Sequence, residues 1–426
     1  MKSVLLSVFT VIGAFVNAQN YVHQVIVLNE GYYDYSSAQI LEPVTIGSYN
    51  PTTQSYTQVN TLADMRFASD AIIVGDVYFV AADTKIFKFD LNTHQLLATV
   101  DCPGVRNLAY ADGKIIATRG EYLVTFDSYL HVYNASDLTL INAFTTANGP
   151  QWATQNLVVD GNTVYVAVNN AYEWGNEKGI IGKLDLSNMT YGNEIDLGAD
   201  GKNPDNMVIS EGYIYTVNNK DWSGSSVSKV ALDGSLNSTV NIAAASTGCG
   251  TSALRDGKIV YQLSLATTLN EFDVVAMNNV GPLAGFDLNY YELAQDPVNG
   301  YLYTSETDYF SYGNVYIYDN SNGLLHDFAV GVSPGTIVFD VRSMAGIDEM
   351  AEEAVIYPNP AVSQINVVTK EGARLIVSDL SGKDVHSVAL AEGQNTVSID
   401  QLNAGTYFFK VLYPDGKVST KKINKI

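Results

Sequence analysis

The stretch that decides the fold runs from Asp160 to Leu186 and reads DGNTVYVAVNNAYEWGNEKGIIGKLDL. It opens on Asp160-Gly161, a pair that favours a tight turn because glycine accepts a positive φ at little cost. β-Branched and aromatic residues then alternate as far as Val168, which predicts a strand. A polar, aromatic loop follows, and a second strand is predicted over residues 181–186. The unit is therefore a turn, a strand, a long loop and a second strand.

This unit recurs along most of the chain, with its second strands spaced 40 to 50 residues apart. Such a period, with four strands in each unit, is typical of the blades of a β-propeller. Because one blade cannot bury both of its faces, the units must stack in a ring. We expect the first strand, near residues 22–28, to complete the last blade. The further turns and first strands are at residues 75–80, 112–117, 211–215, 256–261 and 299–303, and the further second strands at 45–50, 86–90, 131–134, 227–230, 270–273 and 315–319, which predicts seven blades.

The repeats resemble the YncE-like, YVTN-type family of seven-bladed β-propellers. Asn29-Glu30-Gly31, directly after the first strand, resembles the opening of the surface-layer branch found on Gram-negative outer membranes. The resemblance implies an all-β propeller over residues 19–342. It implies no single function, because propellers serve both as binding modules and as enzymes.

The first residues of the chain, 1–18, are predicted to be a secretory signal peptide. Lys2 supplies a positive charge, residues 4–16 an apolar core, and Val16-Asn17-Ala18 a small-residue cleavage site. The apolar run is short for a membrane span. No cysteine follows the cleavage site, so we expect no lipoprotein anchor; a retained N-terminal anchor is the alternative.

The chain is acidic, with a formal net charge of −22 over 426 residues. Such a surface repels nucleic acid and anionic membranes, so we predict no nucleic-acid partner. Cys102 and Cys249 fall in different predicted blades and are expected to remain separate thiols. No CxxC spacing or His/Cys cluster indicates a metal site. We predict a monomer without a bound metal or cofactor.

The pattern changes after residue 342. Residues 343–354 are acidic with few apolar positions and are predicted to be a linker. Alternating strands then predict a small Ig-like β-sandwich over residues 355–426. It ends in a lysine-rich tail.

This last segment resembles the type A C-terminal sorting domain of the type IX secretion system. The resemblance implies that the secretion machinery is a partner and that the protein is secreted or carried to the outer cell surface. It also implies cleavage of the domain after export; an ordinary adhesion-like sandwich is the alternative. The matching features are Tyr357-Pro358-Asn359-Pro360, the turn Leu380-Ser381-Gly382-Lys383, the segment that holds Gly405 and Tyr407, and Lys421-Lys422.

Propeller geometry divides the loops between two faces of the ring. In a blade with strands A to D, the A–B and C–D turns share one face, and they are short here. The B–C and D–A loops share the other face and are long and rich in aromatic, amide and carboxylate side chains. Long loops on a rigid scaffold tend to carry function, so we predict a ligand site there. Its predicted residues are Tyr32, Tyr33, Arg66, Arg119, Trp152, Tyr172, Trp174, Asp221, Trp222, Glu306, Asp308 and Tyr309.

Three functions are compatible with this rim of aromatic and polar side chains. The favoured one is non-enzymatic capture of a small ligand, because similar surface propellers bind cobalamin beside TonB-dependent transporters. That resemblance suggests a corrinoid or metallophore, and a TonB-dependent transporter as a candidate partner. The second is adhesion to a surface glycan or a protein through Trp174 and Trp222. The third is a hydrolase or lyase that pairs carboxylates such as Glu306 and Asp308. No HExxH motif occurs, and we predict that the chain is not an enzyme.

Overall fold

The computed structural model describes residues 20–235, 237–248, 251–343, 354–369, 372–380, 382–413 and 418–426. They divide into two compact units, residues 20–342 and a C-terminal unit that begins at residue 343. The predicted signal peptide, Cys249, Ser381 and most of the predicted linker lie outside the described residues. Among the described residues, no helix is long and apolar enough to cross a bilayer.

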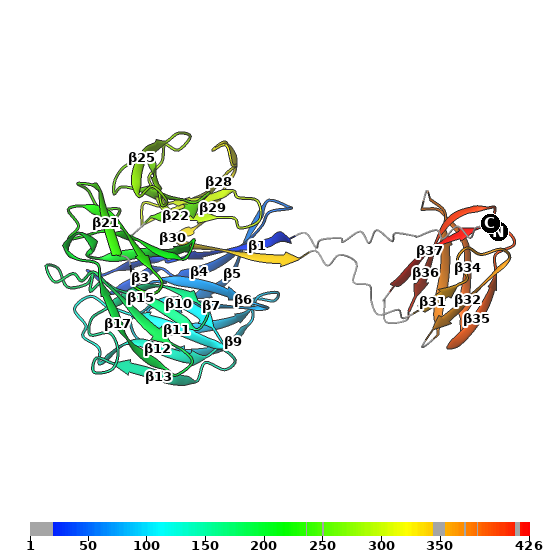
Figure 1. Ribbon diagram of the computed structural model, residues 1–426, viewed down its shortest axis with the longest axis horizontal. Coiled ribbons are helices and arrows are strands. Elements are labelled where there is room, and N and C mark those ends of the chain that lie inside the picture. Colours follow the sequence, from blue (N-terminus) through cyan, green and yellow to red (C-terminus); the bar gives the residue numbers. More distant parts are fainter. Residues whose placement is uncertain are drawn as a thin grey trace, which may run out of the picture. The chain divides into compact units, whose positions relative to one another are not determined.

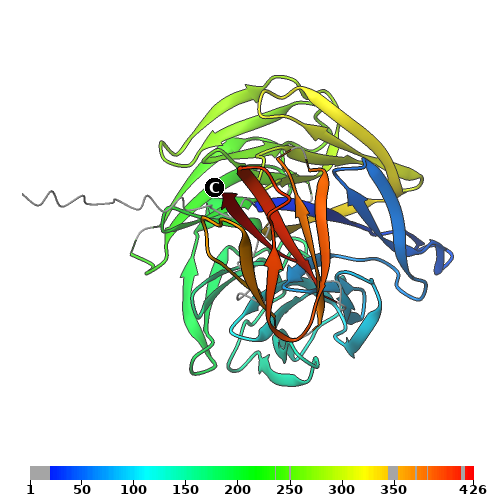
Figure 2. The same cartoon turned by 90° about the vertical axis from the view of Figure 1, so that its right-hand side faces the viewer.

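The first unit is the predicted all-β propeller, with seven four-stranded antiparallel sheets among the described residues of 20–343. Its colours run around the ring from blue through cyan and green to yellow in Figure 2. The strands of each blade are given from the inner strand outwards. Blade 1 holds β30 (Pro334–Ser343), β1 (Asn20–Asn29), β4 (Val44–Asn50) and β5 (Ser55–Leu62); blade 2 holds β6 (Asp70–Val74), β7 (Val77–Ala82), β8 (Lys85–Asp90) and β9 (Leu96–Asp101); and blade 3 holds β10 (Val105–Ala111), β11 (Lys114–Arg119), β12 (Ser128–Asn134) and β13 (Leu140–Thr145). Blade 4 holds β14 (Thr154–Asp160), β15 (Thr163–Val168), β16 (Ile180–Asp185) and β17 (Thr190–Asp196); blade 5 holds β18 (Pro204–Ser210), β19 (Tyr213–Asn218), β20 (Ser225–Ala231) and β21 (Asn237–Ala243); blade 6 holds β22 (Ser252–Arg255), β23 (Lys258–Gln262), β24 (Leu269–Asp273) and β25 (Asn278–Leu283); and blade 7 holds β26 (Tyr290–Gln295), β27 (Leu302–Glu306), β28 (Tyr312–Tyr318) and β29 (Leu324–Val332).

The ring closes in a different way from the one we expected. The first strand, β1, does not complete the last blade; it is the second strand of blade 1 and pairs with β4, where Val25 lies opposite Tyr49. The inner strand of blade 1 is β30, from the far end of the propeller sequence, and Figure 1 shows it beside β1. Blade 7 already holds four strands of its own, so β30 is left to pair with β1. The two ends of the propeller are therefore hydrogen-bonded into one sheet.

Neighbouring blades are joined by apolar side chains that alternate with polar ones along each strand. Between blades 1 and 2, Leu28 and Ile46 share one buried cluster with Tyr78 and Val80. At the seam between blades 7 and 1, the rings of Tyr49 and Phe328 stack with their centroids 4.1 Å apart. Buried aromatic pairs of this kind add about 0.5–1.5 kcal/mol beyond their area burial. The ring is thus held by packing between sheets as well as by the shared sheet of blade 1.

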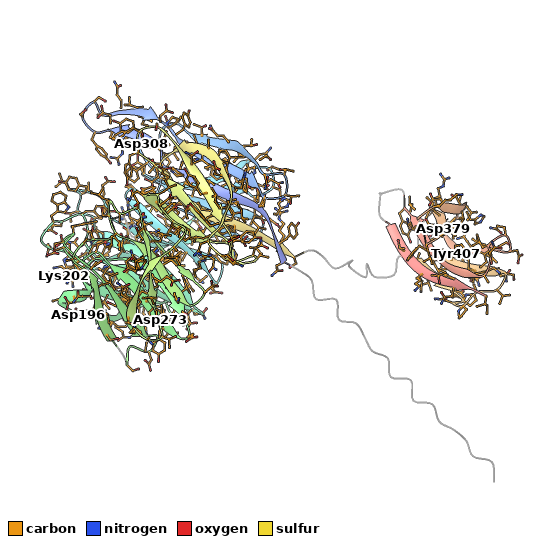
Figure 3. All side chains as sticks on the ribbon, turned by 90° about the horizontal axis from the view of Figure 1, so that it is seen from above. Asp196, Lys202, Asp273, Asp308, Asp379 and Tyr407 are labelled. Carbon is orange, nitrogen blue, oxygen red and sulfur yellow. The ribbon has the colours of Figure 1, made fainter. Side chains whose placement is uncertain are left out.

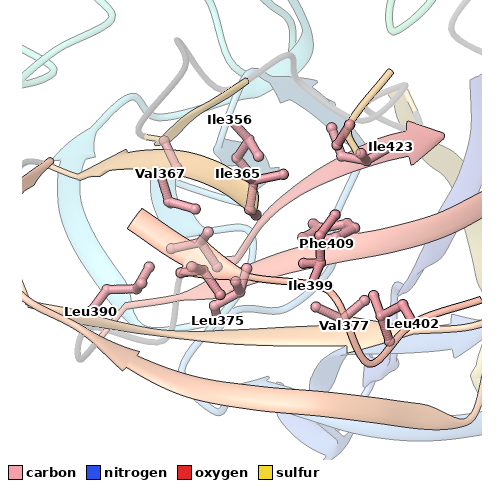
Figure 4. Packing of buried hydrophobic residues seen from close by; sticks show 14 of the residues in the cluster. Ile356, Ile365, Val367, Leu375, Val377, Leu390, Ile399, Leu402, Phe409 and Ile423 are labelled. Carbon is pink, nitrogen blue, oxygen red and sulfur yellow. The ribbon is translucent and has the colours of Figure 1, made fainter. Parts of the chain in front are cut away.

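The C-terminal unit is a two-sheet sandwich, as predicted. One sheet holds β31 (Ala354–Tyr357), β32 (Gln364–Thr369) and β35 (Gly393–Ser398), and the other holds β34 (Asp384–Leu390), β33 (Ala373–Ser378), β36 (Gly405–Leu412) and β37 (Val418–Lys425). Side chains of both sheets, among them Val367, Leu375 and Phe409, meet in one apolar core (Figure 4). This unit therefore has a hydrophobic core of its own.

Candidate ligand-binding site

A cavity of about 520 Å³ opens on the long-loop face of the propeller. Its floor is formed by the first residues of the inner strands, and its wall by the long B–C and D–A loops. One such loop folds into a small hairpin, β2 (Tyr32–Asp34) with β3 (Gln39–Glu42), which places Tyr32 and Tyr33 at the wall. This cavity therefore lies on the face for which a ligand site was predicted.

A repeated β-bulge brings polar residues to the floor of this cavity. In blades 3, 4, 5 and 7 the register shifts where the inner strand begins, and residues of the bulge reach the cavity. A bulge places two residues opposite one and re-aims their side chains. The cavity residues at these four starts are Arg106-Asn107, Gln155-Asn156, Asp205-Asn206 and Tyr291-Glu292.

This bulge is the signal that the sequence prediction missed. A buried leucine or methionine follows each pair, namely Leu108, Leu157, Met207 and Leu293. A pair of polar residues before such an apolar residue, repeated in four blades, marks the floor positions. The prediction instead chose its residues mainly from the long loops.

Carboxylates on the floor and wall have pKa values that burial has raised. Burial raises the pKa of Glu30 to about 7, although the hydroxyl of Tyr291 donates a 2.9 Å hydrogen bond to its Oε1. Burial likewise raises the pKa of Asp70 to about 7 and that of Asp205 to about 6. The pKa of Glu292 lies well above its usual range, first because of burial and then because Asp70 and Glu30 are close. Near neutral pH the carboxyl groups of Glu30 and Asp70 are therefore partly protonated.

One arginine stands among these carboxylates. The guanidinium carbon of Arg106 lies 5.8 Å from the ring centroid of Phe67 and 5.2 Å from that of Tyr172. Its Nε is buried and has no hydrogen-bond acceptor among the described residues. Glu30 and Asp205 are close enough to act on it through charge. Arg106 thus offers its Nε–H, a donor without an acceptor in the described structure, to whatever enters the cavity.

A second arginine, Arg66, is already paired. Its Nε donates to both carboxylate oxygens of Asp83, at 3.1 and 3.0 Å, and its Nη2 reaches Glu121 at 3.3 Å. Hydrogen bonding to Asp83 raises the pKa of Arg66 further. The ring of Tyr33 lies 5.7 Å from the same guanidinium. Arg66 therefore holds the cavity wall in place.

We expect Asp83→Ala to lower the free energy of unfolding by about 2 kcal/mol, because it leaves the half-buried guanidinium of Arg66 without its partner. The side chain of Asp83 is only 5% exposed, whereas Asp101, the partner of Lys85, is 77% exposed. Asp101→Ala is the matched control and is expected to change stability by less than about 1 kcal/mol. Urea unfolding of both variants measures the difference; equal losses would contradict a structural role for the Arg66–Asp83 pair.

The structure brings some of the predicted site residues together at the cavity and places the others elsewhere. Arg119 is buried and donates hydrogen bonds to the carbonyls of Pro103 and Ser128, so it supports the blade 3 loop. Trp152 lies under the ammonium group of Lys178, 4.8 Å from it. The predicted residues that line the cavity are Tyr32, Tyr33, Arg66, Tyr172 and Tyr309.

The remaining predicted residues lie outside the cavity lining, Glu306 at the end of β27 and the others on loops. Glu306 accepts a hydrogen bond from the hydroxyl of Tyr316. Asp308, labelled in Figure 3, accepts hydrogen bonds from two backbone N–H groups of its own loop, and Asp221 does the same for one. Trp174 and Trp222 are 78% and 40% exposed. Glu306 and Asp308 thus have local partners, which weakens the idea of an acid–base pair between them.

Metal binding finds little support in the residues present. No group of three or more His, Cys, Asp or Glu side chains is arranged to hold a metal ion in the part of the chain that the structure describes. Cys102 is a buried free thiol whose pKa is raised by burial. The cavity therefore presents hydrogen-bonding and charged groups of the chain itself.

The sorting-signal residues predicted in the C-terminal unit gather at one end of the sandwich. The side chain of Asn359 donates to the carbonyl of Lys422 and accepts from the N–H of Asn424, at 3.1 and 2.9 Å. Tyr357, Pro358 and Pro360 flank Asn359 in sequence, and Gly405 and Tyr407 pair with residues of the same last strand, which also holds Lys421 (Tyr407 is labelled in Figure 3). The loop that holds Asn359 is thus hydrogen-bonded to the last strand of this unit.

Comparison with known proteins separates the two units. Residues 355–425 match the family described as the secretion system C-terminal sorting domain. The chain is therefore exported by type IX secretion, to the cell surface or beyond it, and the secretion machinery is a partner. No curated protein matches the sequence.

Solved structures share the propeller fold at low sequence identity. A putative 6-phosphogluconolactonase from Bacteroides uniformis is 17% identical with a TM-score of 0.54, and the match covers 75% of this chain and 100% of that one. A second, from Bacteroides fragilis, is 14% identical with a TM-score of 0.52, covering 75% and 98%. The dihydro-heme d1 dehydrogenase NirN in complex with DHE is 15% identical with a TM-score of 0.50, covering 89% and 76%. Likeness at such identities shows the fold alone.

Proposed function

We propose that this exported β-propeller, similar to the YncE-like family, captures a small ligand in its central cavity without converting it. The observation that carries the proposal is the buried Nε of Arg106, which has no hydrogen-bond acceptor among the described residues, beside the carboxylates of Glu30, Asp70 and Glu292, which form no ion pair with a lysine or arginine there. Folding would not keep such groups together for stability alone, because buried charges without partners cost free energy. A ligand that pairs with them recovers that cost.

The size of the cavity narrows the choice of ligand. A volume of about 520 Å³ falls in the range of pockets that enclose small molecules. A corrinoid, with its macrocycle and nucleotide tail, is larger and would have to lie across the mouth, against exposed rings such as Tyr309 and Phe310. Capture of a compact polar ligand therefore fits better than capture of a corrinoid, which stays the second version of the same function.

A thermal-shift screen of the full chain tests the proposal. Corrinoids, haem, siderophores, mono- and oligosaccharides, amino acids, organic acids and Ca²⁺ form the panel. A compound that binds the folded state raises the unfolding midpoint by linkage. We expect a rise with at least one compact polar compound, and its loss in Tyr172→Ala and in Arg106→Gln. No shift with any compound, or a shift that both variants keep, would contradict capture in the cavity.

Trp174 and Trp222 distinguish cavity capture from adhesion, the second candidate. Their exposed rings lie outside the cavity lining and could bind a glycan. We expect the double variant Trp174→Ala/Trp222→Ala to keep its stability within about 0.5 kcal/mol and to keep its cavity ligand. If binding to a glycan array or to cells falls in this variant while the cavity variants are unaffected, adhesion is the better description.

A hydrolase or lyase is the third candidate, and the carboxylates of the cavity are the observation in its favour. Glu30 and Asp70, with pKa values of about 7, are suited to proton transfer at neutral pH. Incubating each compound that binds with the protein, and analysing the mixture by mass spectrometry, separates capture from turnover. A product that forms with the wild type and not with Asp70→Asn would establish an enzyme.

A further inference from the structure

Resting on the proposed function, we infer that the cavity ligand is a small zwitterion, with one ammonium group and one carboxylate, such as a free amino acid or a short peptide. The ammonium group would lie among Glu30, Asp70 and Glu292, and the carboxylate would meet Arg106. The charges of the cavity and the Nε–H of Arg106, unpaired in the described structure, carry this assignment.

The ammonium end rests on three carboxylates that form no ion pair at contact distance in the described structure, although the charge of Arg106 acts on Glu30 from farther away. None of Glu30, Asp70 and Glu292 forms an ion pair with a lysine or arginine among the described residues. Asp70 accepts hydrogen bonds from the backbone N–H groups of Ala71 and Leu108, and Glu30 accepts one from Tyr291. A primary ammonium group carries three N–H donors and a positive charge, so it can bridge such carboxylates.

The carboxylate end rests on the guanidinium of Arg106. The rings of Phe67 and Tyr172 hold this group by cation–π contact. Asp205, the nearby carboxylate, accepts a hydrogen bond from the amide of Asn219, at 3.0 Å. A guanidinium has donors in a fixed fork that matches a ligand carboxylate. Arg66 is less suited, because Asp83 already occupies its fork.

The balance of charge argues against other ligand classes. Arg106 would repel the second ammonium group of a diamine. The carboxylates around Arg106 would repel the second carboxylate of a dicarboxylate. A neutral sugar would leave both ends without a compensating charge. The charged groups that line the cavity are Glu30, Asp70, Glu121, Asp205 and Glu292, against Arg66 and Arg106.

Protonation gives the assignment a second readout. Burial raises the pKa values of Glu30, Asp70 and Glu292 and so holds protons on them near neutral pH, and the nearby charges of Asp70 and Glu30 add to this effect at Glu292. An ammonium group must displace such protons, so binding should release protons and tighten as the pH rises from about 6 to 8. Burial raises the pKa of Tyr35 at the same cavity, so its hydroxyl stays protonated over this range.

Titration calorimetry of the full chain is the test. The probes are the proteinogenic amino acids, di- and tripeptides, putrescine, succinate and a neutral disaccharide, each measured in two buffers of different ionisation enthalpy. We expect a zwitterion to bind and to release protons. Glu292→Gln should weaken it at least tenfold and reduce the proton release, while Glu211→Gln, on an exposed A–B turn, should leave both unchanged.

The methyl ester of the same ligand tests the other end. It lacks the carboxylate, so it should bind the wild type at least tenfold more weakly, and Arg106→Gln should weaken it no further. Arg106→Lys keeps the charge without the fork and should restore part of the affinity. Circular dichroism and the unfolding midpoint confirm that each variant is folded.

The outcomes separate this inference from the proposed function. The inference is wrong if putrescine, succinate or the disaccharide binds and no zwitterion binds. Capture in the cavity stands in that case, provided that Arg106→Gln or Glu292→Gln abolishes the binding signal. If the ester binds as tightly as the zwitterion, the role of Arg106 is wrong. If no compound of any class binds, both are overturned.

Discussion

Ile337→Asp is expected to open the propeller ring and to lower the free energy of unfolding by about 4 kcal/mol or more, because it buries a charge that has no partner. Ile337 lies in β30 and is 4% exposed. It shares a buried cluster with Val25 of blade 1 and Val315 of blade 7. A carboxylate there would disrupt both the sheet of blade 1 and the seam with blade 7. Urea unfolding followed by tryptophan fluorescence measures the loss.

Val341→Asp is the matched control on the same strand. Val341 is 39% exposed, so a carboxylate at this position stays hydrated. We expect a loss of less than about 1 kcal/mol, mainly from the lower β-propensity of aspartate. Equal losses in the two variants would contradict the closure of the ring through the buried face of β30.

The repeated turns and their spacing were sufficient to predict the propeller. Each Asp-Gly or related turn marks a hairpin between the two inner strands of a blade, and the alternation after it gives the strand. The closure was not predictable from the same signals. Val22 to Leu28 has the pattern of a buried strand whichever blade it joins, and its partner is set by contacts with β30, some 300 residues away in the sequence.

The sequence predicted the face of the propeller on which the cavity lies, but only some of the residues that line it. Tyr172 and Trp174 belong to one loop, and both looked equally suited to a rim. The ring of Tyr172 turns inward over Arg106, whereas Trp174 is 78% exposed. Tyr172 and Trp174 are only two residues apart, yet their side chains point in different directions. The composition of a loop does not predict the direction of each side chain. Asp70 and Glu292 were missed because they stand at strand starts, where their polarity looks like ordinary alternation.

The cavity carboxylates should make the ligand-free protein less stable as the pH rises from 5 to 8. The pKa of Glu30 rises from 4.5 to about 7 on folding, and that of Asp70 from 3.8 to about 7. A group whose pKa is raised on folding contributes stability that is complete below its unfolded pKa and is lost as the pH rises through its folded pKa. One pKa unit corresponds to 1.36 kcal/mol, so each group loses about 2 kcal/mol over this range.

Glu30→Gln with Asp70→Asn removes both titrations and keeps the side-chain sizes, and it also lowers the pKa of Glu292, which Glu30 and Asp70 raise. Relative to the wild type, the double variant should gain about 4 kcal/mol between pH 5 and pH 8. Histidines such as His131, whose pKa is lowered to about 4 by burial, oppose the trend below pH 6.5, but they cancel in the comparison. Unfolding free energies at four pH values measure the difference. Parallel pH profiles for the two proteins would mean that both carboxylates are ionised in the folded cavity, and the cavity would then have to hold water or a cation that pairs with them.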